Sequence, residues 1–454
     1  MTALRWNTLR RYGTKSSQHL PLSGIRVLEM GQLIAGPFAG QLLGQFGAEV
    51  IKVEPPRLGD PLRVWRELDT DGTSPWFRSI GRNKKSVAID LRKAEGRERV
   101  ISPYVAHNAV LTYSFRLVKQ LAIKSDVLVE NFKPGTLEKW GLSPEFLHPH
   151  NPSLIFTRVS GYGQTGPWSP RPGYAAVCEA EAGFRYINGF PDPKTGGLAG
   201  PPVRPNMSLG DSVAGLHAAF GTVLALLSKQ SKIQRGENGG SIVDVSILES
   251  MLNLMEGIIP EYNRKGKVRG PSGSSVTGIV PTNAYPCLPE PGSSTPTFIV
   301  IGANGDTIYN RLMIAIGRSE LTGPNYEQNQ HRVQRQTEIE KAISDWTSQK
   351  TIEEVMDTMN AAGVPVGRVV NVKDIVENEH NQARCAIEDV WVDGKDGEGW
   401  NVKMPGTFPR IEGYDFTPRW AGPDLGEHTD VVLEDILGKR EEEVEKLRED
   451  GIIG

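Results

Sequence analysis

The residue best suited to chemistry in this sequence is Asp211, in the stretch from Ser208 to Leu227. It follows a glycine and precedes a run of alanine, leucine, valine and phenylalanine at helical spacing, so it is predicted to lie at or just before a helix N-terminus. The helix dipole favours an ionised carboxylate there. An ionised carboxylate is a nucleophile at neutral pH and needs no general base. The alternative is structural, because Asp is also among the commonest N-cap residues.

Composition limits the class of protein. The chain has 454 residues, enough for two or three domains, with 51 basic and 54 acidic residues, and this balance gives no support for a nucleic-acid partner. Cys178, Cys287 and Cys385 are far apart and lack metal-ligand spacing, so we expect no metal site and a reducing compartment. The longest apolar run, at residues 218–227, is too short to span a membrane, so no membrane partner is expected.

Residues 1–22 have the composition of a mitochondrial presequence. Arg5, Arg10, Arg11 and Lys15 alternate with apolar residues and serines, and no acidic residue occurs before Glu29. Import into the mitochondrial matrix is therefore predicted. The alternative is a basic N-terminal segment without a targeting role, in which case a cytoplasmic location is expected.

The segments before Asp211 alternate between strand and helix patterns. Short apolar runs typical of buried strands occur at residues 25–30, 48–54, 85–91, 126–132 and 153–163. This alternation predicts an α/β fold with a doubly wound, largely parallel, Rossmann-like sheet. No G-x-G-x-x-G follows the first run, so the dinucleotide fingerprint is absent and a dehydrogenase is not favoured.

Glycine, proline and polar stretches divide the chain further. We predict a large α/β domain at residues 23–260, a smaller α+β domain with linkers at 261–380, and a C-terminal segment at 381–454 that packs back on the large domain. Residues 101–117 interrupt what would otherwise be one amphipathic helix. This insertion is either a surface loop or a retained intron in the gene.

Several motifs occur together: LSGIRVLEMGQLIAGPFAGQLLGQFGAEVIKVEPP, GRNKKSVAIDL, SDVLVENFKPGTLEKWGL, NPSLIFTRVSGYGQTGP, SLGDSVAG, AAGVPVGRV and LGEHT. Their content and order resemble the class III CoA-transferase family, which includes formyl-CoA transferase. In that family the aspartate of the Gly-Asp-Ser element attacks the acyl-CoA thioester, and Asp211 is the matching residue. The resemblance implies an aspartyl mixed anhydride, a CoA thioester as substrate, no tightly bound cofactor, and an interlocked homodimer.

The resemblance also implies where CoA binds. Positions that match the family's CoA contacts are Ile34, Ala35, Ile89, Asp90, Leu91, Arg92, Asn131, Phe132, Lys133, Lys139, Pro172, Gly173, Tyr174 and Ala175. Basic side chains of this set can face phosphates, Asn131 can hold an amide, and Phe132 can stack. Two alternatives remain open, because Phe132 could be a core residue and Lys139 a solvated charge. Pro55 replaces the arginine that meets the adenine in other family members.

Related activities need other residues. An α-methylacyl-CoA racemase needs two opposed proton carriers, and the racemases that resemble this chain carry His and Asp where Tyr174 and Ala175 stand. Formyl-CoA transferase carries a glutamate at the place of Ala175, which disfavours oxalate and formate. Glu179 or Glu181 could substitute for that glutamate or serve as helix caps.

Substrate and mechanism follow from the same resemblance. The motifs, with a presequence, are similar to the succinyl-CoA-dependent branch that handles dicarboxylates such as glutarate or itaconate. Arg171 and Arg204 could bind the distal carboxylate, or could be structural ion-pair partners. The glycine- and serine-rich loop at residues 270–278 could supply oxyanion donors. His217 is interpreted as a satisfied core histidine. The contrasting alternative is a non-catalytic CoA-binding paralogue.

Overall fold

The computed structural model describes residues 19–91, 105–290, 292, 295–394 and 398–454. The chain divides into two compact units, each described here by itself. Unit 1 contains the residues up to 182, 207–254 and 383–454, and unit 2 contains 183–206 and 255–382. The predicted large domain of residues 23–260 therefore includes two segments that belong to unit 2. One reason is that the backbone of Gly189 accepts a hydrogen bond from the Gly273 N–H at 2.9 Å.

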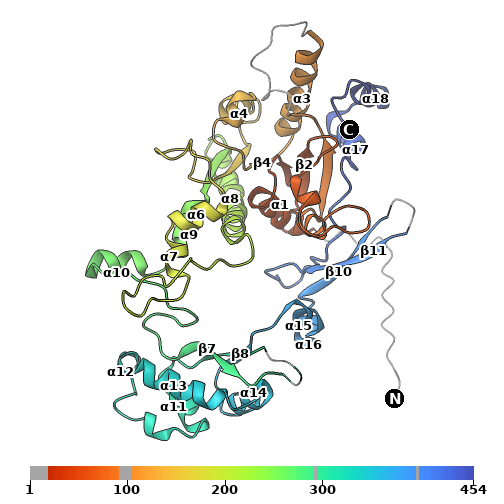
Figure 1. Ribbon diagram of the computed structural model, residues 1–454. Helices are drawn as coiled ribbons and strands as arrows, with labels where there is room; N and C mark the ends of the chain where they lie inside the picture. Colours follow the sequence, from red (N-terminus) through yellow and green to blue (C-terminus); the bar gives the residue numbers. More distant parts are fainter. Residues whose placement is uncertain (1–18, 92–104, 291, 293–294, 395–397) are drawn as a thin grey trace. The chain divides into compact units, whose positions relative to one another are not determined.

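Unit 1 is built on a six-stranded sheet in the order β3-β2-β1-β4-β5-β6, and all paired strands are parallel (Figure 1). The prediction of a doubly wound parallel sheet is confirmed. The strands are β1 Arg26–Glu29, β2 Glu49–Glu54, β3 Lys84–Ala88, β4 Val127–Glu130, β5 Ile155–Ser160 and β6 Ser241–Ser246.

Both faces of this sheet are covered because successive strand residues point to opposite sides. On one face, Leu28 and Leu128 pack with the helices α3 (Val105–Ile123), α17 (Thr429–Leu437) and α18 (Glu441–Glu449). On the other face, Val27 and Val127 pack with α1 (Ala35–Gln45), α6 (Ala175–Glu181), α8 (Leu209–Gln234) and α9 (Ile247–Asn253). Strand order reverses between β1 and β4, and ligands of such folds bind beyond the strand ends at that point.

Helix α3 settles part of the predicted insertion. Residues 105–117 begin this helix, and Ser114 and Leu117 are buried, so the surface-loop alternative is wrong for them. Leu117, Val118 and Leu121 of this helix lie in the core of unit 1. Residues 101–104 lie outside the described part of the chain.

Helix α8 bears on the prediction that no segment spans a membrane. Among the described residues it is the one helix long and apolar enough to cross a membrane, judged by length and composition alone. This is weak evidence, because the core helices of soluble proteins have the same character. Ala214, Ala218 and Ala219 of α8 lie in the core of unit 1.

The remaining elements complete the two units. Unit 1 also holds η1 Pro61–Val64, α2 Pro75–Ile80, α4 Thr136–Lys139, α5 Pro144–Leu147 and the antiparallel pair β10 Ile387–Val392 and β11 Trp400–Pro405. Unit 2 has an antiparallel sheet of β7 Thr282–Cys287, β8 Thr297–Gly302 and β9 Val366–Arg368. Its helices are α7 Phe184–Ile187, α10 Ile258–Lys265, α11 Asp306–Ala315, α12 Asn329–Gln334, α13 Gln336–Thr347, α14 Ile352–Ala361 and α15 Val372–Glu377, with the short turn η3 Ser319–Leu321. Helix α16, Glu379–Ala383, crosses the boundary between the units.

Candidate active site

Asp211 is the third residue of α8 and is half-buried. Its predicted place at a helix N-terminus is confirmed. The N-cap residue is Ser208, so the N-cap alternative for Asp211 is wrong. The side chain of Ser208 makes no capping hydrogen bond. A carboxylate from another helix does this instead, because Glu179 Oε1 of α6 accepts the N–H of Gly210 at 3.1 Å.

Two glycines bring other segments close to Asp211. A Cβ at position 210 would lie 3.2 Å from the Cβ of Ala175, and one at position 215 would lie 2.7 Å from the carbonyl oxygen of Ala35. The start of α8 therefore packs tightly against the starts of α6 and α1. Ala35 and Ala175, two of the predicted CoA contacts, thus lie beside the helix turn that carries Asp211.

The loop between β1 and α1 is held by side chains from two other strand ends. Asn131 Oδ1, just after β4, accepts the N–H of Gln32 at 2.8 Å, and its Nδ2 donates to the Gln32 carbonyl at 2.9 Å. Asp60, which follows β2, accepts the N–H of Leu33 at 3.0 Å. Leu33 adopts φ +64°, a left-handed conformation that is costly for leucine. These bonds fix the backbone that leads to Ile34, and they use the amide of Asn131 for structure.

Two buried lysines in a cluster of charged side chains donate hydrogen bonds to the backbone in and just after this loop. Lys52 Nζ lies 3.0 Å from Glu29 and 2.8 Å from Asp60, and it donates to the Gly31 carbonyl at 2.9 Å. Lys84 Nζ lies 2.7 Å from Glu29 and donates to the Pro37 carbonyl at 2.7 Å. Burial lowers the pKa of Lys84 to about 8, against the attraction of Glu29. Burial acts the same way on Lys52, but Asp60, Glu29 and Glu54 outweigh it and raise its pKa. Carboxylates engaged in this way are structural rather than nucleophilic.

The other predicted CoA contacts divide into exposed and buried residues. Ile89 and Leu91 lie in the core of unit 1, and Ile89 also forms a backbone bridge with Ile453. The ring of Phe132 packs edge-on against Trp140 at 5.0 Å, as its core alternative requires. Lys133, Lys139, Pro172 and Tyr174 are exposed, Asp90 and Gly173 are half-buried, and Arg92 lies outside the described residues.

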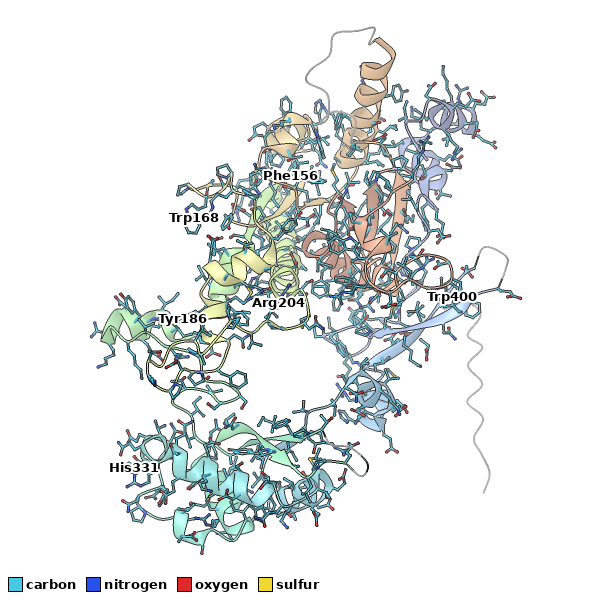
Figure 2. The ribbon with its side chains drawn as sticks, viewed as in Figure 1. Phe156, Trp168, Tyr186, Arg204, His331 and Trp400 are labelled. Carbon is cyan, nitrogen blue, oxygen red and sulfur yellow. The ribbon has the colours of Figure 1, made fainter. Side chains whose placement is uncertain are left out.

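The connector after β5 folds around Arg171. Its guanidinium forms a 2.8 Å ion pair with Glu181 and lies over the rings of Tyr162 and Trp168, at 5.1 and 4.5 Å from their centres. Trp168 of this connector is labelled in Figure 2. Arg171 therefore has the structural partner that its alternative interpretation demands. Arg204, in unit 2, is exposed, and its side chain makes no hydrogen bond or ion pair within the part of the chain that the structure describes.

Cys178 and His217 are two other possible nucleophiles or bases near Asp211, and the environment of each disfavours that role. Burial raises the pKa of the Cys178 thiol to about 11, and the negative charges of Glu181 and Asp211 raise it further. The thiol therefore stays protonated at neutral pH and is a poor nucleophile. Nδ1 of His217 lies 3.0 Å from the hydroxyl of Ser250. The interpretation of His217 as a satisfied histidine is confirmed.

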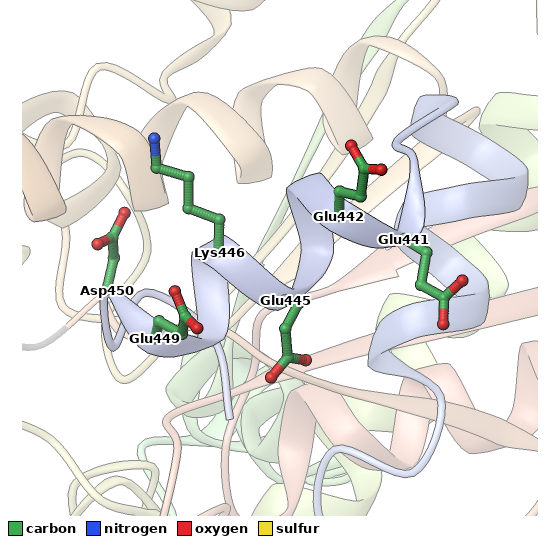
Figure 3. A pocket seen from close by; sticks show the side chains of 6 residues that line it. All are labelled: Glu441, Glu442, Glu445, Lys446, Glu449 and Asp450. Carbon is green, nitrogen blue, oxygen red and sulfur yellow. The ribbon is translucent and has the colours of Figure 1, made fainter.

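A shallow hollow along α18 provides a contrast. It is lined by Lys446 and five acidic residues: Glu441, Glu442, Glu445, Glu449 and Asp450 (Figure 3). Its net negative charge would repel an anionic ligand such as a phosphate. The hollow along α18 is therefore not a candidate site for the phosphates of CoA.

Comparison with known proteins decides the family. The sequence profile described as CoA-transferase family III matches residues 22–429. The chain belongs to CoA-transferase family III. This family III CoA-transferase is 40% identical over 434 residues to succinyl-CoA–D-citramalate CoA-transferase of Chloroflexus aurantiacus, covering 95% of this chain and 98% of that protein. It is 30% identical over 437 residues to the human succinyl-CoA:glutarate CoA-transferase, covering 95% and 90%.

A solved structure supports the same assignment. A CaiB/BaiF family protein from Brucella suis matches with a TM-score of 0.73 and 26% identity, over 92% of this chain and 100% of that one. The predicted resemblance to the family is confirmed, and the chain is an enzyme. Asp60, Lys52 and Gln32 of this CoA-transferase were not identified from the sequence. The Asp60-Pro61 pair was the available signal for Asp60, because Asp before Pro commonly caps a helical turn.

Proposed function

We propose that this CoA-transferase moves CoA from succinyl-CoA to a small dicarboxylate through an anhydride on Asp211. The observation that carries the proposal is the placement of a half-buried carboxylate in the first turn of α8, beside the loop at the strand-order reversal. The succinyl-CoA-dependent relatives that span nearly the whole chain support the choice of donor and of acceptor class.

The chemistry needs no proton carrier. A carboxylate oxygen of Asp211 attacks the thioester carbon, the C–S bond breaks, and CoA leaves as a thiolate. The acceptor carboxylate then attacks the aspartyl carbonyl and releases succinate, which leaves an acceptor–aspartyl anhydride. Attack of the thiolate on the acceptor's carbonyl gives the new thioester and restores Asp211. The helix dipole favours the returning carboxylate.

The binding regions follow from the site. We assign the CoA arm to the segments around Ile34, Ala35 and Ala175, because these lie against the turn that carries Asp211. The exposed Lys133 and Lys139 are available to phosphates. Arg171 is already paired with Glu181, which disfavours it as the partner of the acceptor's distal carboxylate.

The deciding experiment uses heavy-oxygen-labelled acceptors. The protein is incubated with succinyl-CoA and labelled glutarate, itaconate or citramalate, and both the CoA esters and the peptide containing Asp211 are weighed by mass spectrometry. In this route one acceptor oxygen ends on the Asp211 carboxylate. A new ester without label on Asp211 would overturn the anhydride. Loss of stereochemistry from an α-methylacyl-CoA, with no acid gaining CoA, would instead identify a racemase, and no reaction at all a non-catalytic paralogue.

We further propose a homodimer. Leu216, Phe220, Leu224 and Leu227 form a stripe on α8, and each is at least half exposed. A second copy of the chain would remove this apolar surface from water. Sedimentation of the wild type and of Phe220→Glu tests the proposal, and a wild type that sediments as a monomer would refute it.

Residues 1–22 carry our proposal of a matrix location. A fluorescent fusion of these residues should enter mitochondria, whereas a fusion with Arg5, Arg10 and Arg11 changed to glutamate should not. A diffuse signal from the unchanged fusion would contradict the proposal.

A further inference from the structure

The carboxylate of Glu179 has an unusual position for an acid. It is 0% exposed, near the end of α6, although its neighbour on the same helix, Glu181, faces outward toward Arg171. Burying a carboxylate is unfavourable unless hydrogen bonds compensate for the lost water. Glu179 Oε1 accepts the N–H of Gly210 at 3.1 Å. This bond joins α6 to the residue directly before Asp211.

The bond replaces a normal helix cap. The first N–H groups of a helix have no partner within it, and an N-cap side chain usually accepts from one of them. Ser208 occupies the N-cap of α8 but its side chain does not do so. Its carbonyl instead receives both the N–H of Ser212, at 3.0 Å, and the hydroxyl of Ser212, at 2.8 Å. The side-chain cap therefore comes from a different helix, through Glu179.

The packing at this junction leaves little freedom. A Cβ at position 210 would lie 3.3 Å from Cγ and Oε1 of Glu179 as well as 3.2 Å from Ala175. Glycine thus lets the backbone of α8 approach the carboxylate closely. One turn later, Gly215 lies against the Ala35 carbonyl. The backbone of Asp211 is consequently held between a fixed point at residue 210 and another at residue 215.

We propose that Glu179 is a positioning residue that sets the place of the Asp211 carboxylate for attack on the thioester. The inference rests on the proposed function, because it requires Asp211 to be the nucleophile. Glu179 itself gains and loses no proton in the transfer. Small displacements of a reacting group are costly, and a shift of about 1 Å can lower a rate roughly 100-fold.

Three substitutions separate the hydrogen bond from the charge. Glu179→Ala removes the acceptor, and we expect it to slow acylation of Asp211 about 10- to 100-fold with little change in the KM for succinyl-CoA. Glu179→Gln keeps an oxygen for the Gly210 N–H and should stay within about 5-fold of the wild type. Glu179→Asp shortens the side chain by one methylene group, so it should resemble the alanine variant.

The readout is single-turnover trapping of acyl-Asp211 by hydroxylamine, followed by peptide mass spectrometry, with kcat and KM measured alongside. Thr351→Ala is the matched control, because Thr351 caps α14 in unit 2 by accepting the Glu354 N–H at 3.2 Å. It loses a helix-capping hydrogen bond in unit 2 and should acylate at the wild-type rate.

Three outcomes overturn the proposal. Glu179→Ala could acylate Asp211 at the wild-type rate, or Glu179→Gln could acylate it as slowly as Glu179→Ala. The Thr351→Ala control could also slow acylation as much as Glu179→Ala does. If Glu179→Ala fails to fold, the aspartate variant decides, and acylation as fast as in Glu179→Gln overturns the proposal. Asp211→Asn distinguishes the two hypotheses. If that variant still forms an acyl-enzyme, the proposed function itself is wrong. If it does not, while Glu179→Ala reacts normally, only the positioning role fails.

Discussion

Two buried glutamates at strand ends of the same sheet behave in opposite ways. Glu54 ends β2 and Glu130 ends β4, on either side of β1, and each binds a buried arginine. Burial opposes ionisation of Glu54, but Arg63, Lys52 and the Ser86 hydroxyl outweigh it and lower its pKa to about 2. Burial raises the pKa of Glu130 to about 7, and Arg158 compensates only in part.

The difference lies in how the arginines are shared. Arg63 gives two hydrogen bonds to Glu54, at 2.8 and 2.7 Å. Arg158 divides its donors between Glu130, at 2.8 Å, and Glu138, whose charge also opposes ionisation of Glu130. The β2 side therefore carries carboxylates locked by cations, which support structure. We assign the reactive carboxylate to Asp211, which lies in the first turn of α8 and not at these strand ends.

The first prediction tests that assignment and has the largest expected effect. Asp211→Asn should lower kcat by at least about 10³-fold, because removing a covalent nucleophile leaves only binding contributions. The midpoint of urea unfolding should change little, since the side chain is half-buried and the two residues have similar shape. Steady-state transfer of CoA between acids, with unfolding followed by circular dichroism, checks both parts. Near-normal turnover by this variant would show that Asp211 is not the nucleophile, and that it does not differ in function from structural carboxylates such as Glu29 and Asp60.

Lys52→Met tests the opposite region. The substitution removes the buried cation that Glu29 and Asp60 share, and breaking a buried ion pair in this way costs about 3–5 kcal/mol. The free energy of unfolding from urea titrations measures the loss. Because Asp60 also holds Leu33, the KM for the CoA thioester should rise as well.

Lys85→Met is the matched control for Lys52→Met. Lys85 pairs with Glu49 at 2.6 Å from the neighbouring strand, but both side chains are about a third exposed. Such a pair contributes about 0–1 kcal/mol. Equal losses for the two variants would show that burial of the cluster is not what makes it stabilising.

The third prediction concerns pH. The pKa of Glu54 is lowered in the folded state, so its contribution is complete above about pH 4.5 and is lost as pH falls through about 2. The pKa of Glu130 is raised, so its contribution is complete below about pH 4.5 and is lost as pH rises through about 7. Each effect is about 3 kcal/mol at most.

Glutamine variants separate these two effects. Glu54→Gln should flatten the acid side of the stability profile and destabilise the protein at pH 7. Glu130→Gln, which keeps an acceptor for the Phe132 N–H, should flatten the decline between pH 4.5 and 7 and stabilise the protein at pH 8. Urea midpoints at a series of pH values give the slopes. Slopes of the same sign would contradict the comparison between the two strand ends.

The sequence predicted the sheet and the place of Asp211 at a helix start more completely than the side chains that support them. Strands such as β1 and β4 contain apolar residues in succession, and Asp211 lies in a local glycine–aspartate–serine pattern at the start of a helix, so both leave signals within a few residues. The buried ionic cluster leaves no such local signal in the sequence. Lys52 and Lys84 cannot be told from surface lysines by sequence, because only strand pairing brings them close to Glu29. The same holds for Glu179, whose partner Gly210 is 31 residues away. A pair of polar residues that are far apart in the sequence produces no periodic pattern, so the sequence alone does not reveal it.

His217→Gln is the variant with the smallest expected effect, and it tests whether the aspartate acts without a base. His217 lies on α8 within two turns of Asp211, but its Nδ1 lies 3.0 Å from the Ser250 hydroxyl on α9. Glutamine can replace that hydrogen bond only in part, so we expect a loss of about 1 kcal/mol in stability and less than about a 3-fold change in kcat. The pH profile of kcat should keep its shape, because the proposed route uses no histidine as acid or base. A collapse of kcat in a folded protein would place a base beside Asp211, and the carboxylate would then no longer suffice to explain the chemistry.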